Sequence, residues 1–155
     1  MNSVNIQMAL DGAATRVAIS GEFTENANFS ELLGAQTPAI VLDLSGVRRI
    51  NSCGVREWVH LVEALKHSGR SVELERCSVP FVAQLNMIVN FSGGARVRSF
   101  YAPYLCPNCN TEHAELCEMP DSAPPTVREF SKCPSCGSVS EFDDIPYAYL
   151  AFTRG

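Results

Sequence analysis

Four cysteines in the last third of the chain have the types and spacing best suited to chemistry in this sequence. They form two Cys-x-x-Cys pairs separated by 23 residues, Cys106 with Cys109 and Cys133 with Cys136. A turn of this length brings two thiolates close enough to share one metal ion, and two such turns complete a tetrahedral set of sulfur ligands. The pattern predicts one structural Zn²⁺ ion, because four protein ligands leave no open position for catalysis.

The segment that carries these cysteines resembles a zinc ribbon. Pro107 and Pro134 fix the two turns, and Asn110 and Gly137 can take the left-handed conformation that the chain needs after each turn. A loop-rich segment of about fifty residues buries too little surface to fold alone, so we expect the metal to hold it together.

Other uses of the cysteine-rich segment remain open. Thiol redox enzymes also use Cys-x-x-Cys, so a redox function is an alternative hypothesis. A Zn²⁺ ion bound by all four cysteines would exclude it. His113 lies four residues beyond Cys109 and is a substitute ligand in principle, although four cysteines already complete the site. Cys117 has no partner of its own, so we expect a packed residue or a spare thiol. Cys53 and Cys77 are expected to be small apolar residues near the core.

The acidic charge is concentrated in the same segment. Residues 1–100 carry nine Lys or Arg and nine Asp or Glu, whereas residues 101–155 carry three and eight. The formal net charge of −5 therefore lies in the C-terminal third. Phosphate backbones repel such a segment, which argues against nucleic acid as a partner. A zinc-ribbon regulator that binds nucleic acid is nevertheless the rival from another functional class.

The composition indicates a globular cytoplasmic protein. With 155 residues and 46% hydrophobic content, the chain can form one ordinary domain and a small appendage. The first residues lack a basic region followed by an apolar run, so we expect no secretion signal. The most apolar stretch, residues 79–91, is too short to span a bilayer, which argues against membrane insertion. Seven cysteines without a signal suit a reducing cytoplasm.

A second candidate site lies in the stretch DLSGVRRINSCG, residues 43–54. It is predicted to connect a buried strand to a long amphipathic helix. Ser52 ends the expected loop, residues 45–52, beside a helix N-terminus that favours added negative charge. Arg48, Arg49 and Arg56 could pair with a phosphate there, so the functional hypothesis is a phosphorylation or partner-contact site that also includes Asn51. The structural alternative is that Ser52 only caps the helix.

This stretch resembles the core of the STAS domain, the fold of bacterial anti-sigma factor antagonists, and the resemblance covers residues 1–101. In that family the loop ends in Asp-Ser-Ser-Gly, and a partner kinase phosphorylates the first Ser. The resemblance implies that Ser52 is the corresponding site, with Asn51 in place of Asp, Cys53 in place of the second Ser, and Gly54 unchanged. Thr24 is a further departure, since the family often has an Asp there that contacts the partner.

The resemblance implies a regulatory protein-interaction module. Its partner would be an anti-sigma-type kinase or, because STAS domains serve both, an ATPase subunit of a transporter. The sequence has no paired carboxylates in a recognisable frame, no glycine-rich phosphate loop and no Ser-His-Asp order, so we expect no enzymatic activity. The sequence does not predict the oligomeric state.

The remaining pattern predicts a mixed α/β fold. Strands at residues 4–10 and 15–20 would form a hairpin, followed by a short helix at 26–33. A strand at 40–42 precedes a helix from residue 55 that ends at Gly69, with Trp58, Val59, Val62 and Leu65 on its buried face. The expected result is a mixed sheet covered by helices.

Three further elements complete this prediction. A strand at residues 71–76 leads to a helix that starts at Ser78 and Pro80 and continues its core stripe to Val89. A last strand occupies residues 96–101. The final helix usual in the family is absent at this point, because the chain runs through Pro103 into the cysteines. The expected division is a STAS-like domain, residues 1–101, and a small β-rich zinc-ribbon domain, residues 102–155.

Overall fold

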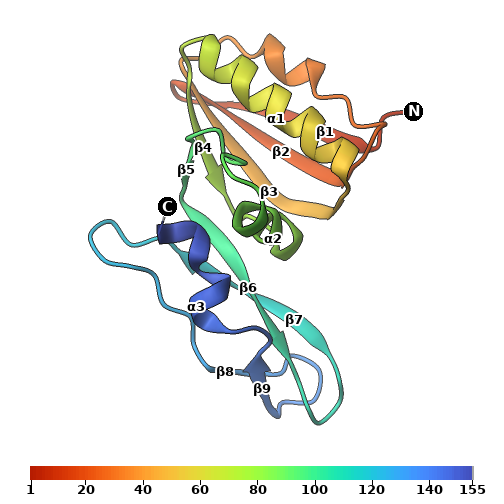
Figure 1. Cartoon of the computed structure of the whole chain (residues 1–155), viewed down its shortest axis with the longest axis vertical. Helices are drawn as coiled ribbons and strands as arrows, with labels where there is room; N and C mark the ends of the chain where they lie inside the picture. Colours follow the sequence, from red (N-terminus) through yellow and green to blue (C-terminus); the bar gives the residue numbers. More distant parts are fainter. Residues whose placement is uncertain (155) are drawn as a thin grey trace.

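Two β-sheets organise the chain in the computed structural model, which describes residues 1–154. The N-terminal sheet has five strands in the order β1-β2-β3-β4-β5, and the C-terminal sheet has four in the order β7-β6-β9-β8. Figure 1 shows the N-terminal sheet at the top, with helices on it, and the C-terminal sheet below.

The N-terminal sheet confirms the predicted mixed topology. β1 (Val4–Asp11) and β2 (Ala14–Phe23) form an antiparallel hairpin, and Gly12 makes the turn with a φ of 62°. The other three strands join in parallel: β3 (Ala39–Ile50), β4 (Ser71–Glu75) and β5 (Arg96–Val97). Parallel strands require crossover connections: a 3₁₀ turn lies in the connection from β2 to β3, and an α-helix lies in each of the next two.

The helices build the core around one tryptophan. α1 (Ser52–His67), α2 (Val79–Met87) and the 3₁₀ turn η1 (Ser30–Gly34) contribute buried residues to it. Trp58 is fully buried, and its indole N–H donates to the carbonyl of Phe91 over 2.8 Å. Its ring stacks on Phe23 and meets Phe81 edge-on. The prediction that Trp58 serves packing is confirmed.

Several local predictions were wrong. The expected helix at 26–33 is only the single turn η1, and the expected loop at 45–52 is mostly strand, because β3 continues beside β2 as far as Ile50. In α1, Leu61 is buried and Val59 only half-buried. α2 ends at Met87, so Val89 lies beyond the helix and outside the core, and it is 87% exposed instead of buried. Cys77 is buried as expected, but Cys53 is exposed on α1.

One strand crosses between the two sheets. The expected strand at 96–101 is two strands, β5 and β6 (Ser99–Leu105), and β6 belongs to the C-terminal sheet. Phe100 of β6 still bridges to Cys77 beside the N-terminal sheet. The predicted boundary between residues 101 and 102 lies inside β6, which continues through it without interruption. The division into two domains therefore stays a prediction.

The C-terminal sheet is completed by three strands: β7 (Glu112–Glu118), β8 (Phe130–Lys132) and β9 (Val139–Phe142). Its inner face is partly polar. His113 on β7 lies 2.8 Å from the Ser140 hydroxyl on β9, and Glu115 on β7 accepts from the Ser131 hydroxyl on β8. Since β7 and β8 are the two edges of this sheet, the bond between Ser131 and Glu115 joins its two edges across one face.

The last residues of the described chain return to the N-terminal domain. α3 (Pro146–Tyr149) and the 3₁₀ turn η2 (Ala151–Arg154) lie beside α2 in Figure 1. The Asn86 side-chain amide donates to the carbonyl of Tyr149 over 2.9 Å, and its oxygen accepts from the N–H of Phe152 over 2.7 Å. Tyr149 and Leu150 join the N-terminal core. This segment, termed the C-terminal return (residues 146–154), covers Phe100.

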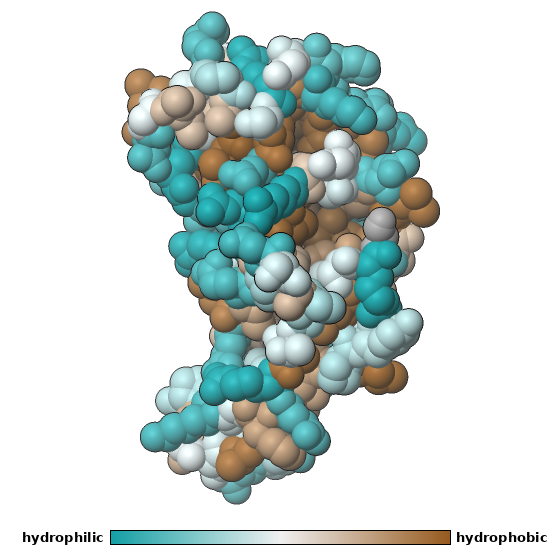
Figure 2. Space-filling model, turned by 90° about the vertical axis from the view of Figure 1, so that its left-hand side faces the viewer, coloured by the Kyte–Doolittle hydropathy of each residue, from teal (hydrophilic) through white to brown (hydrophobic). Residues whose placement is uncertain are grey.

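An open groove lies between the C-terminal return and the N-terminal domain. Its volume is about 920 Å³, and its walls include Ile88, Val89, Met119, Pro124 and Phe152. Figure 2 shows this side of the molecule, where apolar residues gather at mid-height between more hydrophilic ends. Within residues 1–154, no helix has the length and apolar content needed to cross a membrane.

Candidate functional site

The start of α1 is fixed by Asn51. Its backbone is extended, and its side-chain oxygen accepts from the N–H of Gly54 over 2.9 Å, so Asn51 is the N-cap. Its own N–H donates to the carbonyl of Phe23 over 2.9 Å, which ties the cap to the end of β2. The structural alternative for Ser52 is therefore wrong, because Ser52 is the first residue of α1 and Asn51 performs the capping.

Gly54 is required by a close approach of α1 to β2. A Cβ atom at this position would overlap the carbonyl group and the side chain of Phe23. Only glycine permits the first turn of α1 to lie against the strand in this way. The Asn51 cap and Gly54 together hold the preceding strand end and the helix start in one rigid arrangement.

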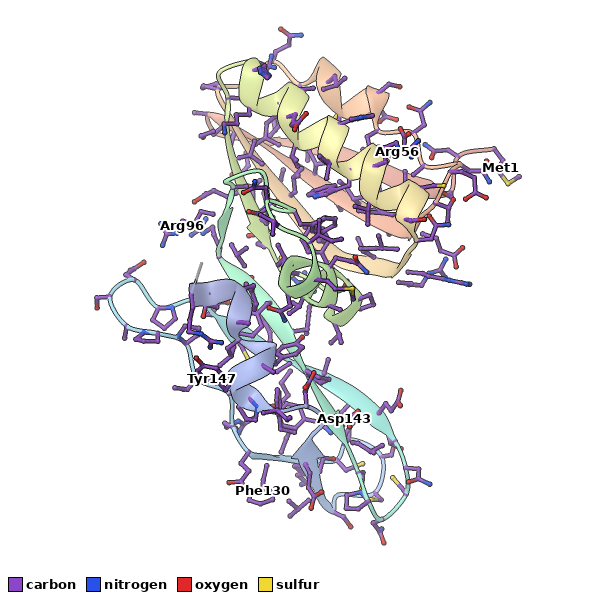
Figure 3. All side chains as sticks on the ribbon, viewed as in Figure 1. Met1, Arg56, Arg96, Phe130, Asp143 and Tyr147 are labelled. Atoms are coloured by element: carbon purple, nitrogen blue, oxygen red, sulfur yellow. The ribbon has the colours of Figure 1, made fainter. Side chains whose placement is uncertain are left out.

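This arrangement leaves Ser52 exposed at the N-terminal end of α1. Arg48, Arg49 and Arg56 are exposed too, and no ion pair within residues 1–154 uses them. Arg49 is aligned with Glu22 of β2, whereas Arg48 lies at a register irregularity of β3. Arg56 lies on α1 (Figure 3). No hydrogen bond in the described chain joins these arginines to Ser52, so their predicted pairing with a phosphate there stays a prediction.

An acidic residue that the sequence did not single out lies beside this site. Glu25 accepts from the side-chain amide of Asn51 over 3.2 Å. Its pKa is lowered from the usual value, chiefly by a hydrogen bond with its own backbone and then by Asn51. Thr24, at the position where the family often has an Asp, donates to the Ser3 hydroxyl and accepts from the N–H of Asn26, so it shapes the turn. The one feature of the sequence that could have identified Glu25 as a site residue is its position next to Thr24.

A shallow groove continues from this site along α1. Its volume is about 710 Å³, and it lies between α1 and the segment before η1. Glu25, Phe29, Glu57, His60 and Leu61 are among its lining residues. The groove is therefore lined both by buried apolar side chains, such as Phe29 and Leu61, and by the carboxylates of Glu25 and Glu57.

The four predicted cysteine ligands meet in one place. The sulfur atoms of Cys106, Cys109, Cys133 and Cys136 all lie within 4.8 Å of one another. Two contacts of 3.6 Å, between Cys106 and Cys136 and between Cys109 and Cys133, join the two turns. All seven cysteines are free thiols. Figure 3 shows sulfur atoms gathered at the lower tip of the C-terminal sheet.

The two turns of this cysteine centre share one backbone geometry. In the first turn, the N–H of Asn110 donates to the carbonyl of Cys106 over 2.8 Å. In the second, the N–H of Gly137 donates to the carbonyl of Cys133 over 3.0 Å. Asn110 and Gly137 have φ values of 60° and 75°, as predicted. The repeated turn presents two pairs of sulfurs to one point.

Hydrogen bonds favour thiolates in the second turn. The side-chain amide of Asn108 donates to the sulfur of Cys136 over 3.5 Å and, with Ser138, lowers the pKa of Cys136 to about 5. The pKa of Cys133 is lowered as well, chiefly by the backbone N–H of Cys136. Since the thiolate is the form that binds metal, this turn is suited to a metal ligand set.

The remaining candidates lie outside the cysteine centre. His113 stacks on Tyr104 with ring centres 5.6 Å apart and contacts Ser140, so its ring already has structural partners. Cys117 is half-buried, and burial raises the pKa of its thiol. Four cysteines close together are compatible with a metal site without either residue.

Comparison with protein families decides the identity of the N-terminal part. A family model described as "Mlab, STAS domain" matches residues 6–97, more than half of the chain. The chain belongs to the STAS domain family. A search of curated proteins gave no match. Membership of the STAS domain family supports a regulatory or protein-interaction role in general.

The match to the STAS domain ends where the N-terminal sheet ends. Its last residue, Val97, is also the last residue of β5. The cysteine centre therefore lies outside the matched range, while Ser52, Asn51 and the three arginines lie inside it. The C-terminal return also lies outside the match, yet it is hydrogen-bonded to Asn86 of the STAS domain, and its Tyr149 packs in the core of that domain.

Proposed function

We propose that the protein is a non-enzymatic regulatory protein whose STAS domain binds a partner protein around Ser52. The docking surface consists of the end of β3 and the start of α1, with Arg48, Arg49, Asn51, Ser52 and Arg56. The observation that carries the proposal is the exposure of Ser52 at a helix start that Asn51 and Gly54 hold rigidly. A preformed surface loses little conformational entropy on binding.

Charge is the property of this surface that phosphorylation would change. A phosphate on Ser52 would lie at the N-terminus of α1, where backbone N–H groups favour negative charge. Glu25, through Asn51, brings a carboxylate close to the same point and would oppose the phosphate. Phosphorylation would therefore change the charge at a point where the helix N-terminus and the Glu25 carboxylate act in opposite directions, and so would change the affinity for a partner. An anti-sigma-type kinase and an ATPase subunit of a transporter are the two partner classes that the family suggests.

Two residues at opposite ends of α1 provide a matched test. Ser52 and His67 are the first and last residues of this helix, and both are exposed. The partner is first captured from the native host and identified by mass spectrometry, which also reads the phosphorylation state of Ser52. Ser52→Asp is then expected to change the affinity of the purified partner, measured by calorimetry, much more than His67→Asp. Equal effects at the two positions would remove the basis for the docking surface.

We further propose that the cysteine centre binds one Zn²⁺ ion with a structural role. A Zn–S bond of about 2.3 Å places two sulfurs of a tetrahedron about 3.8 Å apart. The contacts of 3.6 Å between Cys106 and Cys136 and between Cys109 and Cys133 agree with this edge length. The ion would supply the cross-link that the partly polar inner face of the C-terminal sheet does not provide. A closed set of four ligands also argues against the thiol redox alternative.

Metal analysis tests this second proposal. Protein purified without chelator is expected to contain one zinc ion per chain, with loss of the metal in Cys133→Ser and retention in Cys117→Ser. Metal-free protein that keeps an ordered C-terminal sheet would overturn the assignment, and a disulfide within a Cys-x-x-Cys pair would favour the redox alternative.

A further inference from the structure

The edges of the two sheets differ in how they are protected against pairing with another chain. β5 and β8 are short, with two and three residues. β7 has seven residues but carries exposed Glu112 and Glu118, which would face each other if β7 paired centrally with a second copy. β1 has eight residues, and its pairing with β2 is regular throughout. β1 contains no Pro or Lys, so it lacks the usual protection of an exposed edge.

The hydrogen-bond pattern shows which part of this edge is open. The N–H of Glu22 donates to the carbonyl of Ser3 over 3.1 Å, so Ser3 and each second residue after it direct their backbone groups toward β2. Val4 and each second residue after it therefore direct theirs outward. The N–H of Val4 is already bonded to the side-chain oxygen of Asn2 over 3.2 Å. The open part of the edge thus comprises Ile6, Met8 and Leu10.

The same three residues carry an exposed apolar strip. Their side chains point to the face covered by the helices, since Val4 and Ile6 on that face belong to or adjoin the core. Exposure increases along the strand, because η1 contacts β1 but does not extend over its far end: Met8 is 39% exposed and Leu10 80%. Unpaired backbone groups and uncovered side chains therefore coincide.

We infer that β1 pairs antiparallel with β1 of a second copy of the chain, about a two-fold axis at Met8. This register places Met8 opposite Met8 and Leu10 opposite Ile6, so every outward backbone group from Ile6 to Leu10 gains a partner. The one charged residue of the strand, Asp11, then lies opposite Asn5 rather than opposite another carboxylate. The register centred on Gln7 is disfavoured because it needs the N–H of Val4, which Asn2 occupies.

A second copy fits this edge better than a charged partner does. The contact is isologous, with the same residues on both sides, and it joins the two N-terminal sheets into one continuous sheet. The strip from Ile6 to Leu10 has no charge that could select a basic or acidic segment. Figure 1 places the C-terminal sheet at the other end of the molecule from β1, so the dimer leaves the cysteine centre free.

Opposite charges at Met8 provide a test of both the dimer and its register. Full-length wild-type protein is expected to show a reversible monomer–dimer equilibrium in sedimentation velocity. Met8→Lys and Met8→Glu each place like charges opposite each other at the axis, and each is expected to weaken the dimer by at least about tenfold. An equimolar mixture of the two variants is expected to restore a dimer with one copy of each, because Lys then faces Glu.

Two controls make the outcome specific. Leu116→Lys, at a residue of β7 that is 44% exposed, is expected to leave the dimer unchanged. Leu10→Lys and Leu10→Glu are each expected to weaken the dimer, but mixing them does not restore it, since residue 10 faces residue 6. A wild-type protein that stays monomeric at every concentration, a dimer that tolerates both Met8 variants, or a mixture that stays monomeric overturns the inference.

Discussion

Asn86 offers a direct measure of how strongly the C-terminal return stabilises the STAS domain. Its side chain makes two hydrogen bonds to this segment, to the carbonyl of Tyr149 and to the N–H of Phe152. A typical intramolecular hydrogen bond contributes about 1 kcal/mol to stability. Asn86→Ala is therefore expected to lower the free energy of unfolding by about 2 kcal/mol, and the melting temperature by about 4–8 °C for a chain of this size.

Chemical and thermal denaturation of the full-length protein measure this effect, with Gln84→Ala as the control. Gln84 lies on the same helix, and no side-chain hydrogen bond is formed by it within residues 1–154. Hydrogen exchange gives a local readout, because release of the C-terminal return exposes Phe100 and should reduce protection in β6. If Asn86→Ala is no more destabilising than Gln84→Ala, the two bonds do not hold the segment in place and the reasoning fails.

Three further perturbations have expected outcomes. Gly54→Ala should destabilise the protein by about 2 kcal/mol or more in denaturant titrations, because its Cβ overlaps the carbonyl of β2, whereas Gly34→Ala, with nothing within 4 Å, should be nearly neutral. Cys133→Ser should lower the melting temperature of the STAS domain as well as abolish zinc binding, and Cys117→Ser should do neither; an unchanged melt would show that the C-terminal return docks without the metal. The pKa of Glu115 is held below its usual value of 4.5, chiefly by the Ser131 hydroxyl, so its stabilising contribution is present above pH 4.5 and is lost as the pH falls through the lowered pKa. Glu115→Gln should flatten this acid limb of the stability curve, and an unaltered pH profile would contradict the assignment.

Local patterns in the sequence predicted the parts of the fold that depend on local chemistry. Ser78 caps α2 as expected, since its hydroxyl accepts from the N–H of Phe81. Each Cys-x-x-Cys turn also forms as expected, because it needs only its own four residues and a left-handed residue after them.

The parts that were missed depend on contacts between distant segments. β3 extends through Ser45, Gly46 and two arginines, a composition typical of a loop, because β2 lies alongside and pairs with it. The C-terminal return has only short helical turns of its own, and the bonds that position it reach Asn86 from more than sixty residues away. Glu25 joins the candidate site only because β2 ends beside Asn51.

The C-terminal return also has a consequence for the order of events during synthesis. N-terminal domains usually fold first as a chain leaves the ribosome. Here residues 146–154 emerge after the whole cysteine-containing segment, and Phe100 has no cover from Tyr149 or Phe152 until they do. A nascent STAS domain therefore has an uncovered aromatic side chain until residues 146–154 dock, and under the proposed role of Zn²⁺ the supply of metal would set how long that aggregation-prone interval lasts.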